Sequence, residues 1–408
     1  MKNLAIIRAR GTFVKSVSGV LAFTTLALSA LSSASTAEDT VSGVKTKLTL
    51  RYRAEYVDQE GIEETALAST LKSRLTFTTG SWSGLSGQIE VDDITVIGSE
   101  MYRTPENGYS EYPVVADPEG VDVNQAKLSY QRDGFSSTLG RQRINLGSQR
   151  FVGGVGWRQN EQTYDAFRVG YKTDSNVSVD YAYVWGVERV FGPNDSTSQL
   201  ARWNTESHFI TAASDFEKLG KIELFALFND FNPVPGLSTQ TVGFDYQFKP
   251  KAFTLNFGYA QQNDYGSNPN NFNNDYLSLS ASTEVANLGL SAGYEVLGTD
   301  NGVSFKTPLA TLHKFQGWAD MFLVTPAGGV VDTWAQVKGK VGPVDLLVKY
   351  HQFGSDEDSI DYGDELDLAA TYSFSKDHSI QLKFAQFDGK SMVDVDKVWL
   401  SWNWAWGN

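Results

Sequence analysis

The chain has 408 residues, of which 34 are basic and 48 acidic, so its formal net charge is −14 at pH 7. An acidic chain disfavours nucleic-acid binding, and the absence of cysteine excludes disulfides and thiolate metal sites. Aromatic residues and glycine are plentiful while proline is scarce, which is typical of a large barrel whose strands face water on one side.

The N-terminus has the pattern of a secretory signal peptide over residues 1–37. A basic region is followed by the mostly apolar stretch 17–31 and by the small residues Ser35, Thr36 and Ala37, with cleavage expected before Glu38. This stretch is short of the roughly 20 apolar residues that a spanning helix needs. We therefore expect 38–408 to be a single exported domain in the outer membrane of a Gram-negative bacterium, where the chain must form a closed barrel.

Period-2 alternation of apolar and polar residues predicts about eighteen antiparallel strands. In the first, at 47–56, Leu48, Leu50 and Tyr52 fall on one face, and Arg51, Arg53 and Glu55 fall on the other. The last strand, at 397–406, places Trp402, Trp404 and Trp406 on one face, as expected at a membrane–water interface. The alternation is weakest at 123–130, 135–143 and 207–213.

The connections between these strands alternate between short and long. The short ones are 132–134, 172–176, 249–252, 284–287 and 341–343; the long ones are 98–122, 145–164, 186–206 and 298–331. Outer-membrane barrels have short periplasmic turns and long extracellular loops. A secreted sandwich would not need this asymmetry, and a propeller or β-helix would show a repeat of fixed period. The fold class predicted is an all-β transmembrane barrel.

Basic residues predicted to face the lumen are concentrated in the first half of the chain, and no arginine follows Arg202. They are Arg51, Arg53, Lys72, Arg74, Lys127, Arg141, Arg143 and Arg168. Guanidinium groups bind carboxylates and stay charged, and rings of basic residues favour anions in pores. The cations either form a track for an anionic sugar or another carboxylate, or pair with Glu55, Glu90, Asp92 and Asp165 and organise the lumen. Both roles can coexist.

A distinctive run of motifs occupies residues 140–168. It contains Gly-Arg-Gln-Arg from Gly140, Arg-Phe-Val-Gly from Arg150, Trp-Arg-Gln-Asn from Trp157 and Gln-Thr-Tyr-Asp-Ala from Gln162. Together with the run at 307–320, this pattern resembles the alginate-export family of outer-membrane barrels. The resemblance extends over nearly the whole mature chain. It implies an 18-stranded barrel with a positively charged constriction that passes a polymer of uronic acids.

The resemblance also implies roles for individual residues. It points to Arg141, Arg143, Arg150, Arg158 and Arg168 as lumen arginines, with Glu161 and Asp165 as their counter-charges. Trp157 and Phe151 are expected to pack their loop against the wall. One departure matters, because an exporter has a long gating loop on the periplasmic side and every periplasmic turn predicted here is short. A general diffusion porin for small solutes therefore stays open.

Two outer loops carry further predictions. We expect 298–331 to fold into the bore. The acidic loop 354–364 has carboxylates that could bind Ca²⁺, but it lacks the EF-hand spacing, and a solvated loop facing lipopolysaccharide is favoured. No cofactor or metal is otherwise expected. The expected partners are outer-membrane lipid and lipopolysaccharide, an anionic saccharide or small solute, and, for an exporter, periplasmic secretion partners.

An enzyme is not expected. The chain has four histidines, and neither Gly-x-Ser-x-Gly nor His-Glu-x-x-His occurs, which disfavours a barrel lipid hydrolase. A surface adhesin or receptor is the remaining alternative. Only 38–46 separate the cleavage site from the first strand, so a plugged, energy-coupled transporter is disfavoured.

Overall fold

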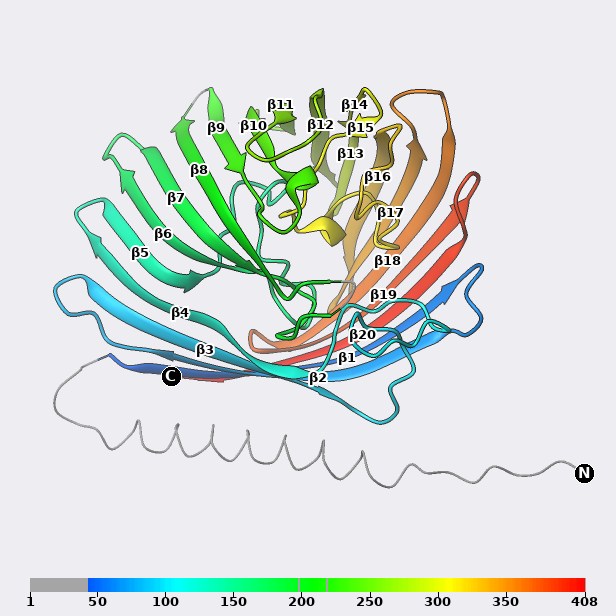
Figure 1. The fold of residues 1–408 in the computed structure, drawn as a ribbon, viewed down its shortest axis with the longest axis horizontal. Coiled ribbons are helices and arrows are strands. Elements are labelled where there is room, and N and C mark those ends of the chain that lie inside the picture. The colour runs from blue at the N-terminus through cyan, green and yellow to red at the C-terminus, as the bar shows by residue number, and fades with distance from the viewer. Residues whose placement is uncertain (1–42, 197–198, 218, 408) are drawn as a thin grey trace, which may run out of the picture.

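A closed barrel forms in the computed structural model, which describes residues 43–196, 199–217 and 219–407. Eighteen strands make one antiparallel sheet. β1 (Lys45–Gln59) pairs with β2 (Ala66–Thr78) on one side and with β20 (Val395–Gly407) on the other, so the sheet closes on itself. Figure 1 shows red β20 beside blue β1.

Each remaining strand of the barrel pairs with its neighbours in chain order. They are β3 (Leu85–Val96), β4 (Gly120–Arg132), β5 (Phe135–Gln142), β6 (Thr163–Lys172), β7 (Val177–Glu188), β8 (Arg202–Phe216), β9 (Gly220–Asn229), β10 (Thr239–Phe248), β11 (Thr254–Asp264), β12 (Asn273–Val285), β13 (Leu288–Leu297), β16 (Val330–Val341), β17 (Val344–Gly354), β18 (Asp361–Ser375) and β19 (His378–Gly389). The predicted strand number and the alternation of short and long connections are confirmed. The predicted signal peptide lies outside the described residues.

The outer surface of the barrel is apolar. Leu279 of β12 is 53% exposed and Leu382 of β19 is 51% exposed, whereas their neighbours Ser280 and Lys383 turn inward. A closed sheet satisfies its own backbone, and apolar side chains on its outside suit lipid. This surface suits a barrel that spans a lipid membrane. No helix in the described part of the chain is long and apolar enough to cross a membrane.

The weak alternation near 123–130 has a structural cause. Glu90 of β3 pairs with Gln125 of β4, but the next residue, Val91, pairs with Val123, so Asn124 is an extra residue. Such a β-bulge reverses the phase of the alternation. Val121 and Val123 therefore point outward before the bulge, and even-numbered residues point outward after it.

A tight turn joins β4 to β5 and shows how the short connections are made. Asp133 and Gly134 both have positive φ, at 50° and 80°, which is the pattern of a type I′ hairpin turn. A Cβ at Gly134 would collide with the carbonyl oxygen of Lys172. This position therefore requires glycine.

The long loops lie at the opposite end, and two of them turn into the ring of strands (Figure 1). Loop 298–329 contains the small hairpin β14 (Thr299–Asp300) and β15 (Val303–Ser304) and the 3-10 turn η2 (Leu312–Lys314); a second 3-10 turn, η1 (Pro235–Leu237), lies elsewhere. Phe322 of this loop is buried against Phe353 of the wall, with ring centroids 4.6 Å apart. The predicted infolding of this loop is confirmed.

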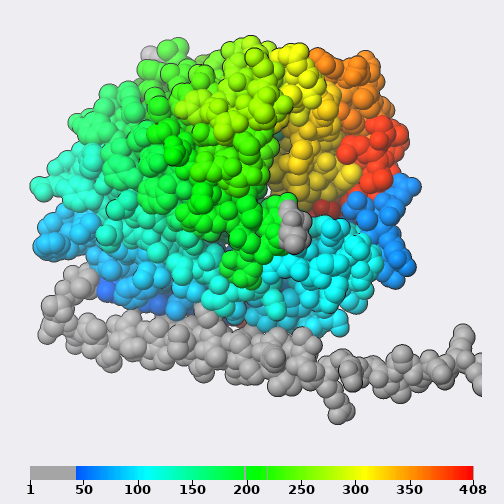
Figure 2. All heavy atoms as spheres, viewed as in Figure 1, coloured from blue at the N-terminus to red at the C-terminus, as the bar shows by residue number. Residues whose placement is uncertain are grey.

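A further pair of outer loops packs together beside the barrel mouth. Figure 2 shows the green segment after β7 against the cyan loop 97–119. Asn194 Nδ2 donates to Glu106 Oε2 at 3.4 Å, and a Cβ at Gly192 would touch the ring of Pro118. Loop 97–119 is therefore packed against the segment that follows β7.

Candidate functional site: the lumen

Two infolded loops cross the lumen and are joined to each other. Loop 143–162 follows β5, and loop 298–329 follows β13. The Gly153 N–H donates to the Leu309 carbonyl at 2.9 Å, and the Thr311 N–H donates to the Gln149 carbonyl at 3.1 Å. Because these backbone bonds make the two loops one unit, the width of the lumen depends on both.

Asp117, from loop 97–119, ties a third loop to this unit. Its Oδ1 accepts the N–H of Gln159 at 2.8 Å, and its Oδ2 lies 3.6 Å from Arg53 Nη1 and 3.9 Å from Arg158 Nη1. The Asp117 side chain is 1% exposed. A buried carboxylate in contact with two guanidinium groups is compensated in charge, so it fixes loop 143–162 against β1.

Glu161 is the centre of a cluster of cations, the Glu161 cluster, formed with Lys72, Arg74 and Arg143. Arg74 Nη1 lies 2.8 Å from Glu161 Oε1 and Lys72 Nζ lies 3.8 Å from it, while Arg143 donates to Oε2. Burial alone would raise the pKa of Glu161, but the three cations hold it well below its usual range. The predicted role of Glu161 as a counter-charge is confirmed.

Asp165 belongs to a second charged cluster. Arg141 Nε donates to Asp165 Oδ1 at 3.0 Å, and its Nη2 donates to Glu188 Oε1 at 2.6 Å. Arg202 donates to both carboxylates. Glu188 and Arg202 fall within the loop predicted at 186–206, so neither was expected at the site; in the structure they face each other at the ends of β7 and β8.

Three predicted lumen arginines are buried. The side-chain exposures of Arg53, Arg150 and Arg158 are 2%, 2% and 9%. Arg150 Nε donates to Glu295 Oε1 at 2.9 Å, and Arg158 Nη1 donates to Glu55 Oε2 at 3.0 Å. The prediction that these three line the solute path is therefore corrected, since in this conformation they hold the infolded loops to the wall.

The remaining predicted cations differ in whether a carboxylate compensates them. Arg74 is bonded to Asp92 at 2.6 Å and Arg168 to Asp180 at 2.8 Å. Arg51 donates instead to neutral oxygens, among them Gln159 Oε1 and the Gly156 carbonyl, both at 2.9 Å. Lys127 donates to Gln125 Oε1 at 2.9 Å. Within the described ranges, Arg51 and Lys127 form no ion pair.

Strands β16, β17 and β19 supply three lumen cations that were not predicted from the sequence, Lys338, Lys349 and Lys383. Lys349 Nζ lies 4.5 Å from the ring centroid of Trp334. Lys383 Nζ donates to His313 Nε2 at 2.8 Å. As far as the structure describes the chain, no carboxylate pairs with any of the three. Their positions on the inward face of alternating strands could have predicted them from the sequence.

Trp157 and Phe151 pack as expected. The Trp157 ring stacks on His313 at 4.2 Å between centroids, and Lys383 Nζ lies 3.9 Å from its centroid. Phe151 contacts Phe225 of the wall at 5.0 Å. Both rings therefore anchor loop 143–162.

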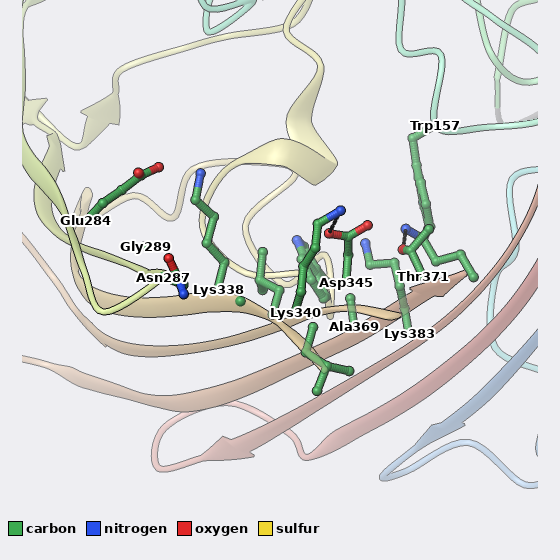
Figure 3. Close-up of a pocket in the computed structure, with 15 residues that line it drawn as sticks. Trp157, Glu284, Asn287, Gly289, Lys338, Lys340, Asp345, Ala369, Thr371 and Lys383 are labelled. Atoms are coloured by element: carbon green, nitrogen blue, oxygen red, sulfur yellow. Dashed lines mark hydrogen bonds and ion pairs between the residues drawn. The ribbon is translucent and has the colours of Figure 1, made fainter. Parts of the chain in front are cut away.

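Among the cavities that the described residues line are two sizeable ones in the lumen. The larger, about 650 Å³, is lined by Lys338, Lys340, Lys383, Asp345, Trp157 and Trp318 among others. Figure 3 shows Lys338 and Lys383 extending from the wall into it, with Lys340 paired to Asp345 at 3.2 Å. The second, about 470 Å³, is lined by Lys221, Lys314, Lys349, Glu223, Asp245 and Trp334 among others. Both cavities combine charge with an aromatic ring and are large enough for a small solute.

No group of three or more metal-ligating side chains occurs among the residues that the structure describes. Calcium binding at the acidic outer loop stays a prediction, as do the expected contacts with lipopolysaccharide and periplasmic partners.

No protein-family model matches the chain, and no curated protein matches it in sequence. The crystal structure of Acinetobacter baumannii OccAB4 superposes with a TM-score of 0.70 at 13% identity, covering 90% of this chain and 99% of that one. Pseudomonas aeruginosa OpdK with vanillate gives 0.69 at 13% identity, covering 91% and 100%. Pseudomonas aeruginosa OccK9 (OpdG) gives 0.68, also at 13%, covering 91% and 100%. The chain has the fold of these outer-membrane porins.

This likeness confirms the closed 18-strand barrel and agrees with an outer-membrane location. The similar structures are channels rather than enzymes. None of the matches supports the alginate-export resemblance in particular. At 13% identity the likeness shows the fold and leaves the solute to be argued from the lumen.

Proposed function

We propose that the protein is a passive outer-membrane channel for small hydrophilic solutes, with a preference for anions. The observation that carries this proposal is the set of lumen cations without a described carboxylate partner: Arg51, Lys127, Lys338, Lys349 and Lys383. Uncompensated cations in a narrow, low-dielectric passage attract anions and repel cations.

The size of the free space favours small solutes over a polymer. The lumen is crossed by two loops joined by backbone hydrogen bonds, and buried ion pairs hold these loops to the wall. A threaded uronate chain would have to displace them. We therefore favour the small-solute porin over the polysaccharide exporter that the resemblance implied.

A carboxylate is the anion that the site fits best. Lysine and arginine bind carboxylates by charge-assisted hydrogen bonds, and Trp318 and Trp334 offer apolar surface in the two cavities. The similar structure of OpdK contains vanillate, an aromatic carboxylate. We propose the same chemical class here.

Liposome swelling tests this function. Proteoliposomes are placed in solutions of vanillate, gluconate, uncharged glucose, lysine as a cation, and oligouronates. We expect faster swelling with the two carboxylates than with glucose, slower swelling with lysine, and no swelling with oligouronates. Equal rates for the carboxylates and lysine would contradict the anion preference, and rapid oligouronate entry would restore polymer transport.

Two further proposals concern the export of the chain. We propose that residues 1–37 are removed and that 38–408 form the mature domain. Mass spectrometry of protein purified from outer membranes should give an N-terminus at Glu38; a retained leader would contradict this.

A further inference from the structure

One carboxylate of loop 298–329, that of Asp320, accepts hydrogen bonds from three basic side chains. Its Oδ1 lies 2.8 Å from His313 Nδ1. Its Oδ2 accepts from Arg158 Nη2 at 3.1 Å and from Lys397 Nζ at 3.3 Å. We call these three donors the Asp320 site.

The Asp320 site connects separate parts of the molecule. Arg158 belongs to loop 143–162 and also bonds to Glu55 of β1. Lys397 belongs to β20. The other ring nitrogen of His313, Nε2, lies 2.8 Å from Nζ of Lys383 in β19. A single carboxylate therefore joins both infolded loops to three neighbouring strands of the wall.

The site is built around a charged carboxylate. The side-chain exposure of Asp320 is 4%, and those of its donors are 8% for His313, 9% for Arg158 and 8% for Lys397. Burial alone would raise the pKa of Asp320, but His313, Lys397 and Arg158 hold it well below its usual range. An anion is thus stabilised here.

The backbone beside Asp320 is fixed as well. Asp320 has φ of 62° and Gly317 has φ of 79°, both in the left-handed region. Glu365 of β18 accepts the N–H groups of Trp318 and Ala319, and a Cβ at Gly317 would collide with its carboxylate. The backbone conformation of the loop therefore places the Asp320 carboxylate within hydrogen-bond distance of its donors.

We propose that Arg158, Lys397 and His313 form a carboxylate-binding site that Asp320 occupies from within the chain, and that this occupancy sets the width of the lumen. Without the carboxylate, Arg158 and Lys397 form an excess of buried positive charge between the loops and the wall, which is unfavourable. The loops then move away from the wall into a wider arrangement. This inference rests on the proposed function only in that the lumen conducts. It does not require a preference for anions, so a wrong role for Asp320 would leave the proposed anion channel intact.

Planar-bilayer recordings of Asp320→Asn and Asp320→Ala test whether the Asp320 carboxylate sets the width of the lumen. Because conductance follows the open cross-section, we expect an increase of about twofold or more over wild type. Asp300→Asn, in the half-buried hairpin β14–β15 of the same loop, is the matched control and should keep wild-type conductance. Barrel folding is checked by heat-dependent mobility in gels. If neither Asp320 variant folds, Lys397→Met removes the same contact from the wall side. A folded variant with conductance at or below that of wild type would overturn the role in pore width.

Chemical rescue tests whether Arg158, Lys397 and His313 form a carboxylate-binding site. Acetate added to Asp320→Ala supplies the missing carboxylate, and we expect the ratio of variant to wild-type conductance to return toward one. Nitrate at equal ionic strength should leave the ratio raised. Because acetate's lower mobility reduces the conductance of variant and wild type alike, it does not change the ratio between them. Equal effects of acetate and nitrate, or no effect of either, would overturn the carboxylate-binding site.

Discussion

The Glu161→Gln substitution tests whether buried counter-charges hold the infolded loops. At an effective dielectric constant of about 20, a charge pair at the 2.8 Å of Arg74 is worth roughly 6 kcal/mol, and one at the 3.8 Å of Lys72 roughly 4 kcal/mol. Desolvation offsets part of this attraction. Removing one partner of a buried pair costs roughly 3–5 kcal/mol net, because the other partner is left uncompensated.

Hydrogen exchange of the loop 143–162 amides measures this loss. A cost of roughly 3 kcal/mol raises the population of locally opened molecules by about a hundredfold, and exchange rates rise with it. The strand amides should change little. Glu357→Gln, in the exposed acidic outer loop, is the control and should exchange like wild type. An unchanged rate in loop 143–162 of the Glu161 variant would refute the reasoning.

Three other predictions follow from the lumen. The pKa of His313 is lowered by burial from 6.5 to about 3, so the folded loop binds fewer protons than the unfolded one between these values. The free energy that holds the loop closed should fall as pH drops below about 6.5, by roughly 3 kcal/mol at pH about 4.5. This loss is measured as faster amide exchange after correction for intrinsic rates. Corrected exchange rates that do not change with pH would contradict this. Lys349→Met should lower the chloride-to-potassium permeability ratio, whereas the surface variant Lys376→Met should not; equal ratios in both would remove Lys349 from the solute path. Phe322→Ala leaves a cavity against Phe353 that costs roughly 3–5 kcal/mol, so loop 298–329 should become protease-sensitive while the barrel stays heat-modifiable, and a resistant loop would show that this packing is dispensable.

The barrel was predictable from the sequence because its pattern is local. Residues i and i+2 of a strand share a face whatever their partner is, so the inward positions of Arg51 and Arg53 followed from Leu48, Leu50 and Tyr52 alone. At 123–130 the prediction weakened because a bulge at Asn124 reversed the phase.

The site was less predictable because its contacts are not local. The inward arginines could be found, but which of them are compensated depends on contacts such as Arg150 with Glu295 and Arg158 with Asp320. These contacts join residues that are 145 and 162 positions apart in the chain. Lys349 and Lys383 were not predicted because they belong to no motif, although neither forms an ion pair with a described carboxylate.

The reversal potential of wild-type protein in a planar bilayer under a potassium chloride gradient tests the central claim most directly. We expect a potential whose sign shows chloride passing more readily than potassium, because Arg51, Lys127 and Lys349 form no ion pair with a described carboxylate. A potential of the opposite sign would mean that Glu223 and Asp245 dominate the lumen, and it would contradict a channel for anions.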